Sequence, residues 1–166
     1  MKERIWVGER YDEHRILVLG ESWYGTEDEF PGDLITDAGW IAAYLRAEVR
    51  DTLYTRIANA AGKSRGEFWQ RVAFTNYVRA AVGPTRQQKA ASAHFKEAVP
   101  RLRCLLDELK PRGVFLLGTG QAEYSGPVIG EAAIPWVAVR HPTGSRGVTH
   151  AEVRAGWDDL MTKLTA

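Results

Sequence analysis

Four short polar segments of this sequence contain the side chains best suited to acid–base or polar chemistry. Each comes directly after a short run of apolar residues, and together they include Glu21, Asn76, Thr119 and His141. A carboxylate and an imidazole can stabilise the opposite charges that develop when a bond breaks, and a carboxamide can recognise the polar edge of a flat ring. The sequence therefore predicts a site for recognition and bond cleavage, provided that the fold brings these segments together.

The first segment, Gly20-Glu-Ser-Trp-Tyr-Gly25, combines a carboxylate with two aromatic rings. Its first glycine permits a tight exit from a strand and the close approach of a ligand. Glu21 would then lie at the floor of a cleft, with Trp23 and Tyr24 as flat surfaces beside it. The alternative interpretation is that Glu21 pairs with an arginine and the rings pack over the edge of a sheet.

Asn76 and His141 each have a functional and a structural interpretation. Asn76 offers one acceptor and two donors in one plane, which suits the edge of a base, but an asparagine after a strand is often a turn residue. Pro142 fixes the backbone just after His141, so the imidazole is held and can donate to an oxygen on which negative charge develops. The alternative is a histidine satisfied by backbone groups.

The apolar runs before these segments predict four strands of a parallel sheet. Each run is short and continuous, as is typical of strands that are buried on both faces. They cover residues 15–19, 72–75, 114–117 and 136–139. A loop over residues 20–36 is expected after the first strand, and Asn76 is expected at the end of the second.

Helices are expected between the strands. One spans about residues 36–61, with Thr36 or Asp37 as its cap and a break near Arg50. Apolar residues at three- and four-residue steps predict two further amphipathic helices. These cover residues 88–110, with a kink or the start of a new segment at Pro100, and residues 150–164.

Strands that alternate with helices predict an α/β fold. Parallel strands need right-handed crossovers, which place helices on both faces of the sheet. We therefore expect a three-layer α/β/α arrangement around a central four-stranded parallel sheet. Ligands bind beyond the carboxyl ends of the strands in open sheets of this kind. That rule selects the four polar segments, the last of which runs from Arg140 to Arg146.

The composition is that of one globular domain over residues 1–166. Lysine and arginine number 22 against 21 aspartate and glutamate, so the sequence lacks the basic excess of proteins that bind long stretches of DNA. Any contact with DNA is expected to have a small footprint. The charged start and the lack of a long apolar run predict a cytoplasmic, monomeric protein without a membrane segment.

Several other chemistries do not fit the motifs. Gly118-Thr-Gly-Gln is not a complete phosphate-binding loop, and Ser22 lacks the flanking glycines of a hydrolase nucleophile. The four histidines show no metal-ligand spacing, and a single cysteine excludes an internal disulfide and a cysteine-cluster metal site. Cys104 lies in a predicted amphipathic helix and is expected in the core. We therefore expect no metal and no cofactor.

The order and spacing of the polar segments resemble the uracil-DNA glycosylase superfamily. Gly20-Glu-Ser-Trp-Tyr-Gly25 is similar to its first motif, a water-activating loop after the first strand. Phe74-Thr-Asn-Tyr77 is similar to the strand end whose asparagine recognises uracil. His141-Pro-Thr-Gly-Ser-Arg146 is similar to the second signature, His-Pro-Ser followed by an arginine or polar residue. The resemblance covers the chain from about Arg15 to Arg146.

The resemblance implies an enzyme that flips uracil or a related damaged base out of single- or double-stranded DNA and hydrolyses its N-glycosidic bond. Glu21 would position the attacking water or stabilise the sugar cation, and His141 would donate to the departing base. The residues that it assigns to the base are Ser22, Trp23, Tyr24, Phe30 and Asn76, with Trp40 as an alternative stacking residue. Those that it assigns to DNA are Thr119, Arg140, Thr143, Ser145 and Arg146.

The sequence departs from the superfamily at positions that affect catalysis. Ser22 stands where many members have Asp or Asn, Trp23 replaces a proline, and Thr143 replaces a serine. Members with a Gly-Glu first motif commonly carry an iron–sulfur cluster, which one cysteine cannot ligate. Two alternatives therefore remain open. One is a non-catalytic relative that binds nucleobases or nucleic acid, and the other is an unrelated α/β enzyme that acts on a small nucleotide or sugar, with His141 as acid and Glu21 as base.

Overall fold

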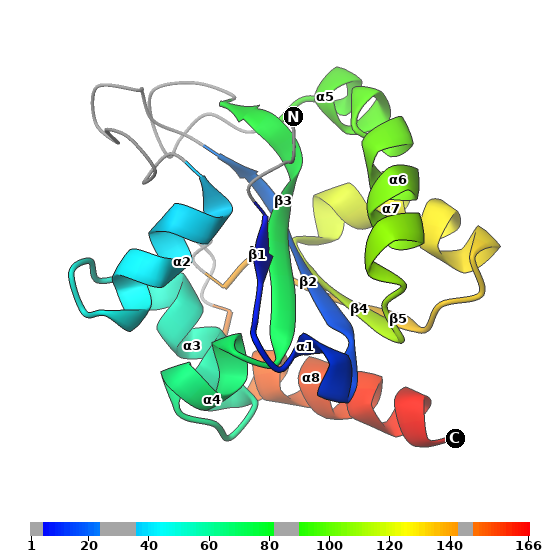
Figure 1. Cartoon of the computed structure of the whole chain (residues 1–166). Coiled ribbons are helices and arrows are strands. Elements are labelled where there is room, and N and C mark those ends of the chain that lie inside the picture. Colours follow the sequence, from blue (N-terminus) through cyan, green and yellow to red (C-terminus); the bar gives the residue numbers. More distant parts are fainter. Residues whose placement is uncertain (1–4, 24–35, 82–89, 143–147) are drawn as a thin grey trace.

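The computed structural model describes residues 5–23, 36–81, 90–142 and 148–166, which contain a five-stranded sheet (Figure 1). Its strands lie in the order β1-β3-β2-β4-β5. Their bounds are Trp6–Val7 (β1), Ile16–Trp23 (β2), Val72–Ala81 (β3), Gly113–Leu117 (β4) and Trp136–Val139 (β5). The α/β class is confirmed, but the prediction of a purely parallel four-stranded sheet is wrong. Strands β2 to β5 are parallel, whereas β1 pairs with β3 in the antiparallel direction.

Strand β1 was missed in the sequence because it has only two residues in a polar segment. Its ladder pairs Trp6 with Phe74, and the indole nitrogen of Trp6 also donates to the carbonyl oxygen of Trp69 at 2.7 Å. The amide of Gly8 then donates to the carbonyl oxygen of Val72 at 3.0 Å. The short strand covers the outer edge of β3 only as far as Phe74, so the next residues of β3 need other partners.

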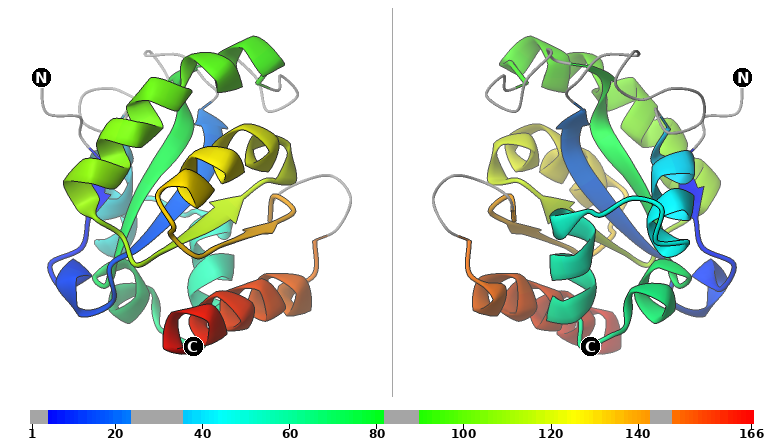
Figure 2. Two further views of the ribbon diagram at one scale, coloured as in Figure 1. Left: turned by 90° about the vertical axis from the view of Figure 1, so that its right-hand side faces the viewer. Right: turned by 90° about the vertical axis from the view of Figure 1, so that its left-hand side faces the viewer.

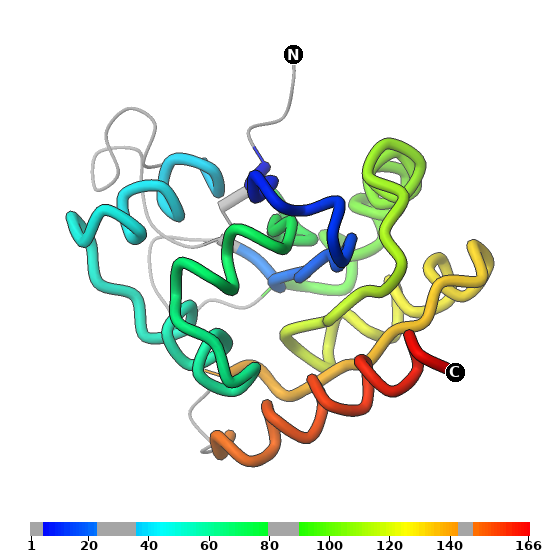
Figure 3. The backbone as a smooth tube through the Cα atoms, turned by 60° about the horizontal axis from the view of Figure 1, so that its bottom comes forward, coloured from blue at the N-terminus to red at the C-terminus, as the bar shows by residue number. Residues whose placement is uncertain are grey.

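Helices cover both faces of the sheet (Figure 2). One face packs against α2 (Asp37–Leu45), α3 (Thr52–Ala60), α4 (Arg65–Trp69) and α8 (His150–Thr165). The other packs against α5 (Ser92–Glu97), α6 (Val99–Leu109) and α7 (Thr119–Glu131), and α1 (Tyr11–His14) lies between β1 and β2. Figure 3 shows α8 beside α3 and along the sheet. Among the described residues, no helix is both long and apolar enough to cross a membrane.

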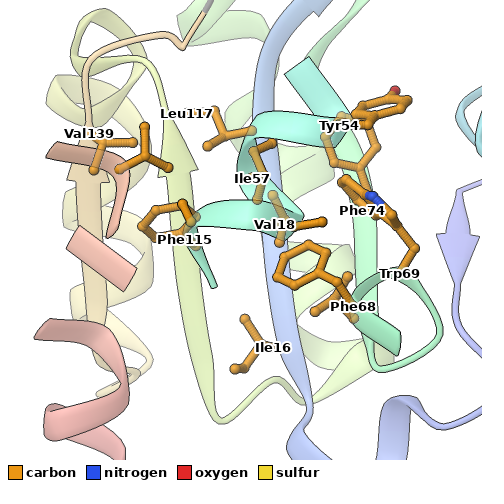
Figure 4. Packing of buried hydrophobic residues seen from close by; sticks show 14 of the residues in the cluster. Ile16, Val18, Tyr54, Ile57, Phe68, Trp69, Phe74, Phe115, Leu117 and Val139 are labelled. Atoms are coloured by element: carbon orange, nitrogen blue, oxygen red, sulfur yellow. The ribbon is translucent and has the colours of Figure 1, made fainter. Parts of the chain in front are cut away.

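The face under α2, α3, α4 and α8 has an aromatic core (Figure 4). Tyr54 lies edge-on to Trp69 and Phe74, with ring centroids 4.8 Å and 5.2 Å away. Ile16 and Val18 of β2 belong to the same cluster. Since side chains alternate along a strand, the even-numbered residues of β2 face this aromatic core.

The opposite face has a core made mainly of aliphatic residues. Leu17 and Leu19 of β2 share a cluster with Leu102 of α6 and Ile129 of α7. Alternation along β2 therefore directs Glu21 to the same side as α7. Packing into the two cores therefore fixes the face of the sheet on which each polar residue near the strand ends lies.

The helix expected after Thr36 is confirmed as two helices with a break. The side chain of Thr36 caps α2, and that of Asp51 caps α3 by accepting hydrogen bonds from backbone amides. The break lies around Arg50, as predicted. The second expected helix divides into α5 and α6, with Pro100 in the first turn of α6, where a proline is tolerated.

Two strands are longer than expected. Strand β2 continues through Gly20 to Trp23, so the predicted loop begins later. Strand β3 continues to Ala81, so the prediction that Asn76 ends its strand is wrong. The two extensions pair with each other, with Gly20 opposite Asn76. Apolar patterning could not reveal them, because Gly20, Glu21, Ser22 and Asn76 interrupt the apolar runs.

Cys104 lies on the exposed side of α6, so the prediction that it belongs to the core is wrong. Its neighbours Leu102, Leu105 and Leu106 fill the buried side of the helix. A helix presents only about half of its surface to a core, and these leucines already occupy that half.

Candidate functional site

The parallel strands bring the polar residues singled out in the sequence to one edge of the sheet. Glu21 and Asn76 lie in the extended parts of β2 and β3, Gly118 follows β4, and His141 follows β5. These residues occupy two sides of the edge. Glu21 contacts the beginning of α7, whereas Asn76 and His141 interact with groups of α2 and α3.

Glu21 is placed against the beginning of α7 by two glycines. A Cβ on Gly118 would lie 2.5 Å from Oε2 of Glu21, and a Cβ on Gly120 would lie 3.7 Å from it. Gly118 also has a φ of 129°, which other residues rarely adopt. The partial positive charge at the N-terminus of α7 favours a carboxylate at this position. The half-buried charge of Glu21 therefore depends on the absence of a side chain at residue 118.

Gln121 of α7 forms hydrogen bonds that hold the strand ends near Glu21 in place. Its side chain is fully buried, and Nε2 donates to the carbonyl oxygen of Leu19 at 3.0 Å and to that of Leu117 at 3.1 Å. These bonds tie the ends of β2 and β4 together just before Gly20 and Gly118. The sequence analysis assigned no role to Gln121, because nothing local shows that a helical glutamine is buried.

Asn76 is held in one orientation by the buried carboxylate of Asp37. Nδ2 of Asn76 donates to Oδ1 of Asp37 at 2.9 Å, and the backbone amide of Asn76 donates to Oδ2 at 3.3 Å. This network assigns the carboxamide nitrogen to the side of Asp37 and the oxygen to the side of Gly20. A Cβ on Gly20 would lie 2.3 Å from that oxygen. Gly20 and Asp37 together therefore fix the plane of the carboxamide.

Asp37 also belongs to a buried network that crosses β3. The hydroxyl of Thr75 donates to Oδ2 of Asp37 at 2.7 Å and accepts from Arg101 of α6 at 2.8 Å. Arg101 also donates to the carbonyl oxygen of Asn76 at 2.8 Å. Asp37 thus satisfies the edge of β3 that β1 leaves uncovered. The sequence analysis assigned Asp37 only a capping role, because no local pattern connects it with residues so far along the chain.

His141 is half-buried beside α3. Burial lowers the pKa of its imidazole below the ordinary value, and the nearby carboxylate of Asp51 acts in the opposite direction. The carbonyl oxygen of Pro142 accepts a hydrogen bond from Arg56 of α3, which fixes the segment that contains His141. The lowered pKa keeps the imidazole neutral at pH 7, so it can donate one N–H without bringing a positive charge.

Asp51, the carboxylate near His141, accepts hydrogen bonds from both α3 and α2. Its Oδ1 accepts from the backbone amide of Leu53 at 2.8 Å, and its Oδ2 accepts from the indole nitrogen of Trp40 at 3.0 Å. Trp40, which the sequence analysis considered for stacking on a base, therefore has its polar atom engaged with Asp51. Asp51 itself was missed, because its sequence environment signals only a helix cap.

The remaining site residues from the sequence analysis have different environments. Ser22 is half-buried in the ladder between β2 and β3, and Trp23 is the last residue of β2. Thr119 is exposed at the start of α7. Arg140 is exposed and forms an ion pair with Glu152 of α8. The residues that lie outside the described part of the chain are Tyr24, Phe30, Thr143, Ser145 and Arg146.

Neither a metal cluster among the described residues nor a match to a protein-family model or curated sequence identifies the chemistry of this site. Within those ranges, no group of three or more His, Cys, Asp or Glu side chains could hold a metal ion. No protein-family model and no curated protein sequence matches the chain. Its function must therefore be inferred from the residues and their geometry.

Proposed function

We propose that this protein is a DNA glycosylase that hydrolyses the N-glycosidic bond of uracil, or of a related damaged base, after the base leaves the stack. The observation that carries this proposal is the carboxamide of Asn76, held in one orientation by Asp37 at the carboxyl edge of the sheet. Its oxygen and its second N–H form an adjacent acceptor and donor. The N3–H and O4 of uracil are the complementary pair, whereas cytosine presents the opposite pattern at these positions.

The charges on the two sides of the edge suit the cleavage of a glycosidic bond. Cleavage leaves positive charge on the sugar and negative charge on the base. The carboxylate of Glu21 would stabilise the sugar cation and position the attacking water. On the other side, the neutral imidazole of His141 would donate to O2 of the departing base.

The proposal includes a uracil-DNA glycosylase-like fold. It is supported by the motif residues at the carboxyl edge of parallel strands, with helices on both faces of the sheet. The antiparallel strand β1 is an addition to the expected parallel core. Tyr24 and Phe30, which the resemblance assigns to the base, remain predictions that lie outside the described residues.

Ser22 favours a second candidate, a non-catalytic relative that binds a nucleobase or nucleic acid. It stands where many superfamily members have an acidic or amide residue in the water-activating motif. If Glu21 does not take over that role, the same fixed carboxamide would bind a base without cleaving its bond. Excision and binding must therefore be measured separately.

The test is excision from labelled single- and double-stranded oligonucleotides that contain one uracil, measured by alkaline cleavage at the abasic position. We expect cleavage that depends on uracil and is lost in Glu21→Gln and Asn76→Ala. The exposed residues Glu123 and Asn59 provide matched controls, Glu123→Gln and Asn59→Ala, which should cleave like the unmodified protein. Absence of cleavage with uracil and with a panel of damaged bases would contradict the glycosylase. Base binding that still depends on Asn76 would then support the second candidate.

A further inference from the structure

A pocket of about 520 Å³ lies between the end of α2, the beginning of α3 and the beginning of α4. It is separate from Glu21 and Asn76, and its lining contains three arginines, Arg50, Arg56 and Arg65. All three side chains belong to exposed residues. A pocket with three positive charges is suited to an anion with several oxygen atoms.

The three arginines have no carboxylate partner among the described residues. The ion pairs there involve other cations, namely Arg10, Arg46, Arg71, Arg103, Arg140 and Lys163. Among the described residues that line the pocket, Asp51 is the one carboxylate, and its oxygens accept hydrogen bonds from the first turn of α3 and from Trp40. The described part of the chain therefore leaves an excess of positive charge in this pocket.

Two of the three guanidinium groups are held in place by neighbouring groups. Arg65 lies over the ring of Tyr44, 5.6 Å from its centroid, and Arg56 donates to the carbonyl oxygen of Pro142. A planar guanidinium presents paired donors that match the oxygens of a phosphate group. Held side chains also lose less conformational entropy when a ligand binds. Phosphate is therefore the anion that this pocket fits best.

The pocket is connected with the proposed active site through Arg56, because Pro142 follows His141 directly. A flipped nucleotide stays covalently attached to its flanking phosphates, so a base site needs a phosphate site beside it. We propose that Arg50, Arg56 and Arg65 bind a backbone phosphate of the nucleic-acid strand whose base enters the site, an inference that rests on the proposed function. This concentration of contacts also explains how a chain of net charge +1 can bind a polyanion.

The test is binding of a fluorescently labelled oligothymidylate of about 12 nucleotides, measured by anisotropy over a range of NaCl concentrations. Arg50→Gln and Arg65→Gln remove pocket charges, whereas Arg56 is left intact because it also holds Pro142. We expect each variant to bind several-fold more weakly, and the slope of log K against log salt to become shallower by about 0.7 for each lost phosphate contact. The control is Arg112→Gln, an exposed arginine before β4, at the opposite edge of the sheet.

Unchanged affinity and slope in both pocket variants would overturn the proposal, and so would an equal loss in Arg112→Gln. Thermal unfolding with added inorganic phosphate distinguishes the source of the phosphate. Stabilisation that requires Arg50 and Arg65, with unchanged oligonucleotide binding, would assign the pocket to a small phosphate ligand and overturn the strand assignment. The oligothymidylate contains no uracil, so strand binding that depends on these arginines would support this pocket even if excision failed.

Discussion

The two sides of the carboxyl edge use carboxylates in opposite ways. On the side of α7, the carboxylate of Glu21 itself approaches the edge, against Gly118. On the side of α2 and α3, the carboxylate of Asp37 holds the neutral side chain of Asn76, and that of Asp51 acts on the imidazole of His141. One side therefore presents a charge, and the other presents neutral groups supported by charges behind them.

This difference shows how one edge can serve two developing charges. A buried carboxylate that accepts several hydrogen bonds can orient a neutral donor and acceptor without facing the ligand. A negative charge in direct contact with a base that becomes anionic would oppose its departure. Asp37 and Asp51 are satisfied by donors of the protein, whereas Glu21 lies on the side proposed for the sugar cation.

Removing the carboxylate charge of Glu21 should have the largest effect on excision. Glu21→Gln keeps the shape of the side chain and removes its charge, so we expect excision to fall by about 100-fold or more with little change in stability. Single-turnover cleavage of a uracil oligonucleotide measures this effect, with Glu123→Gln of α7 as the matched control. Equal rates in Glu21→Gln and the unmodified protein would remove the proposed role of the α7 side.

Replacing the buried carboxylate of Asp37 should affect stability as well as activity. In Asp37→Asn, one amide oxygen must replace two carboxylate oxygens that accept from Thr75 and twice from Asn76. We expect a loss of about 3 kcal/mol in the free energy of unfolding, as for other broken buried networks, and a fall in excision of about 10-fold. Urea denaturation and single-turnover cleavage measure the two effects. Full selectivity for uracil over cytosine in this variant would show that Asp37 does not orient the carboxamide.

The position of Glu21 should depend on residue 118. Gly118→Ala introduces a Cβ where Oε2 of Glu21 lies and places alanine at a strained φ, so we expect a loss of about 1–3 kcal/mol. Activity should fall less than in Glu21→Gln, because the carboxylate remains but is displaced. Gly130→Ala in the same helix, where a new Cβ meets nothing within 4 Å, is the control for thermal unfolding and cleavage. A Gly118→Ala protein with normal stability and rate would contradict the contact.

The smallest effect concerns the protonation of His141. Because burial lowers its pKa in the folded state, the unfolded chain takes up the proton first as the pH falls. The stability contributed by the neutral imidazole is therefore complete above about pH 6.5 and is lost as the pH falls from there towards the folded-state pKa. His141→Gln should flatten this part of the profile, which is checked by urea denaturation at a series of pH values. Equal slopes in His141→Gln and the unmodified protein would contradict the lowered pKa.

Features that depend on neighbouring residues could be predicted from the amino-acid sequence. The apolar runs predicted β2 to β5 in outline, and helical periodicity predicted α6 and α8. The cap of α2 was predicted as Thr36 or Asp37, and the structure shows that it is Thr36. The strand-end rule also selected Glu21, Asn76 and His141 before their positions were known. Caps and periodicity are readable in a sequence because their hydrogen bonds and packing faces repeat within a few residues.

The contacts that support those residues are visible only in the folded chain. The bond between Asp37 and Asn76 joins residues 39 positions apart, one in α2 and the other in β3. The contact of Glu21 with Gly118 and the grouping of the pocket arginines beside α3 are likewise visible only in the tertiary structure. Such contacts depend on how whole elements pack against one another, which no local pattern of residue types specifies. The sequence therefore selects the chemical groups, whereas the packing of the helices on the sheet orients them.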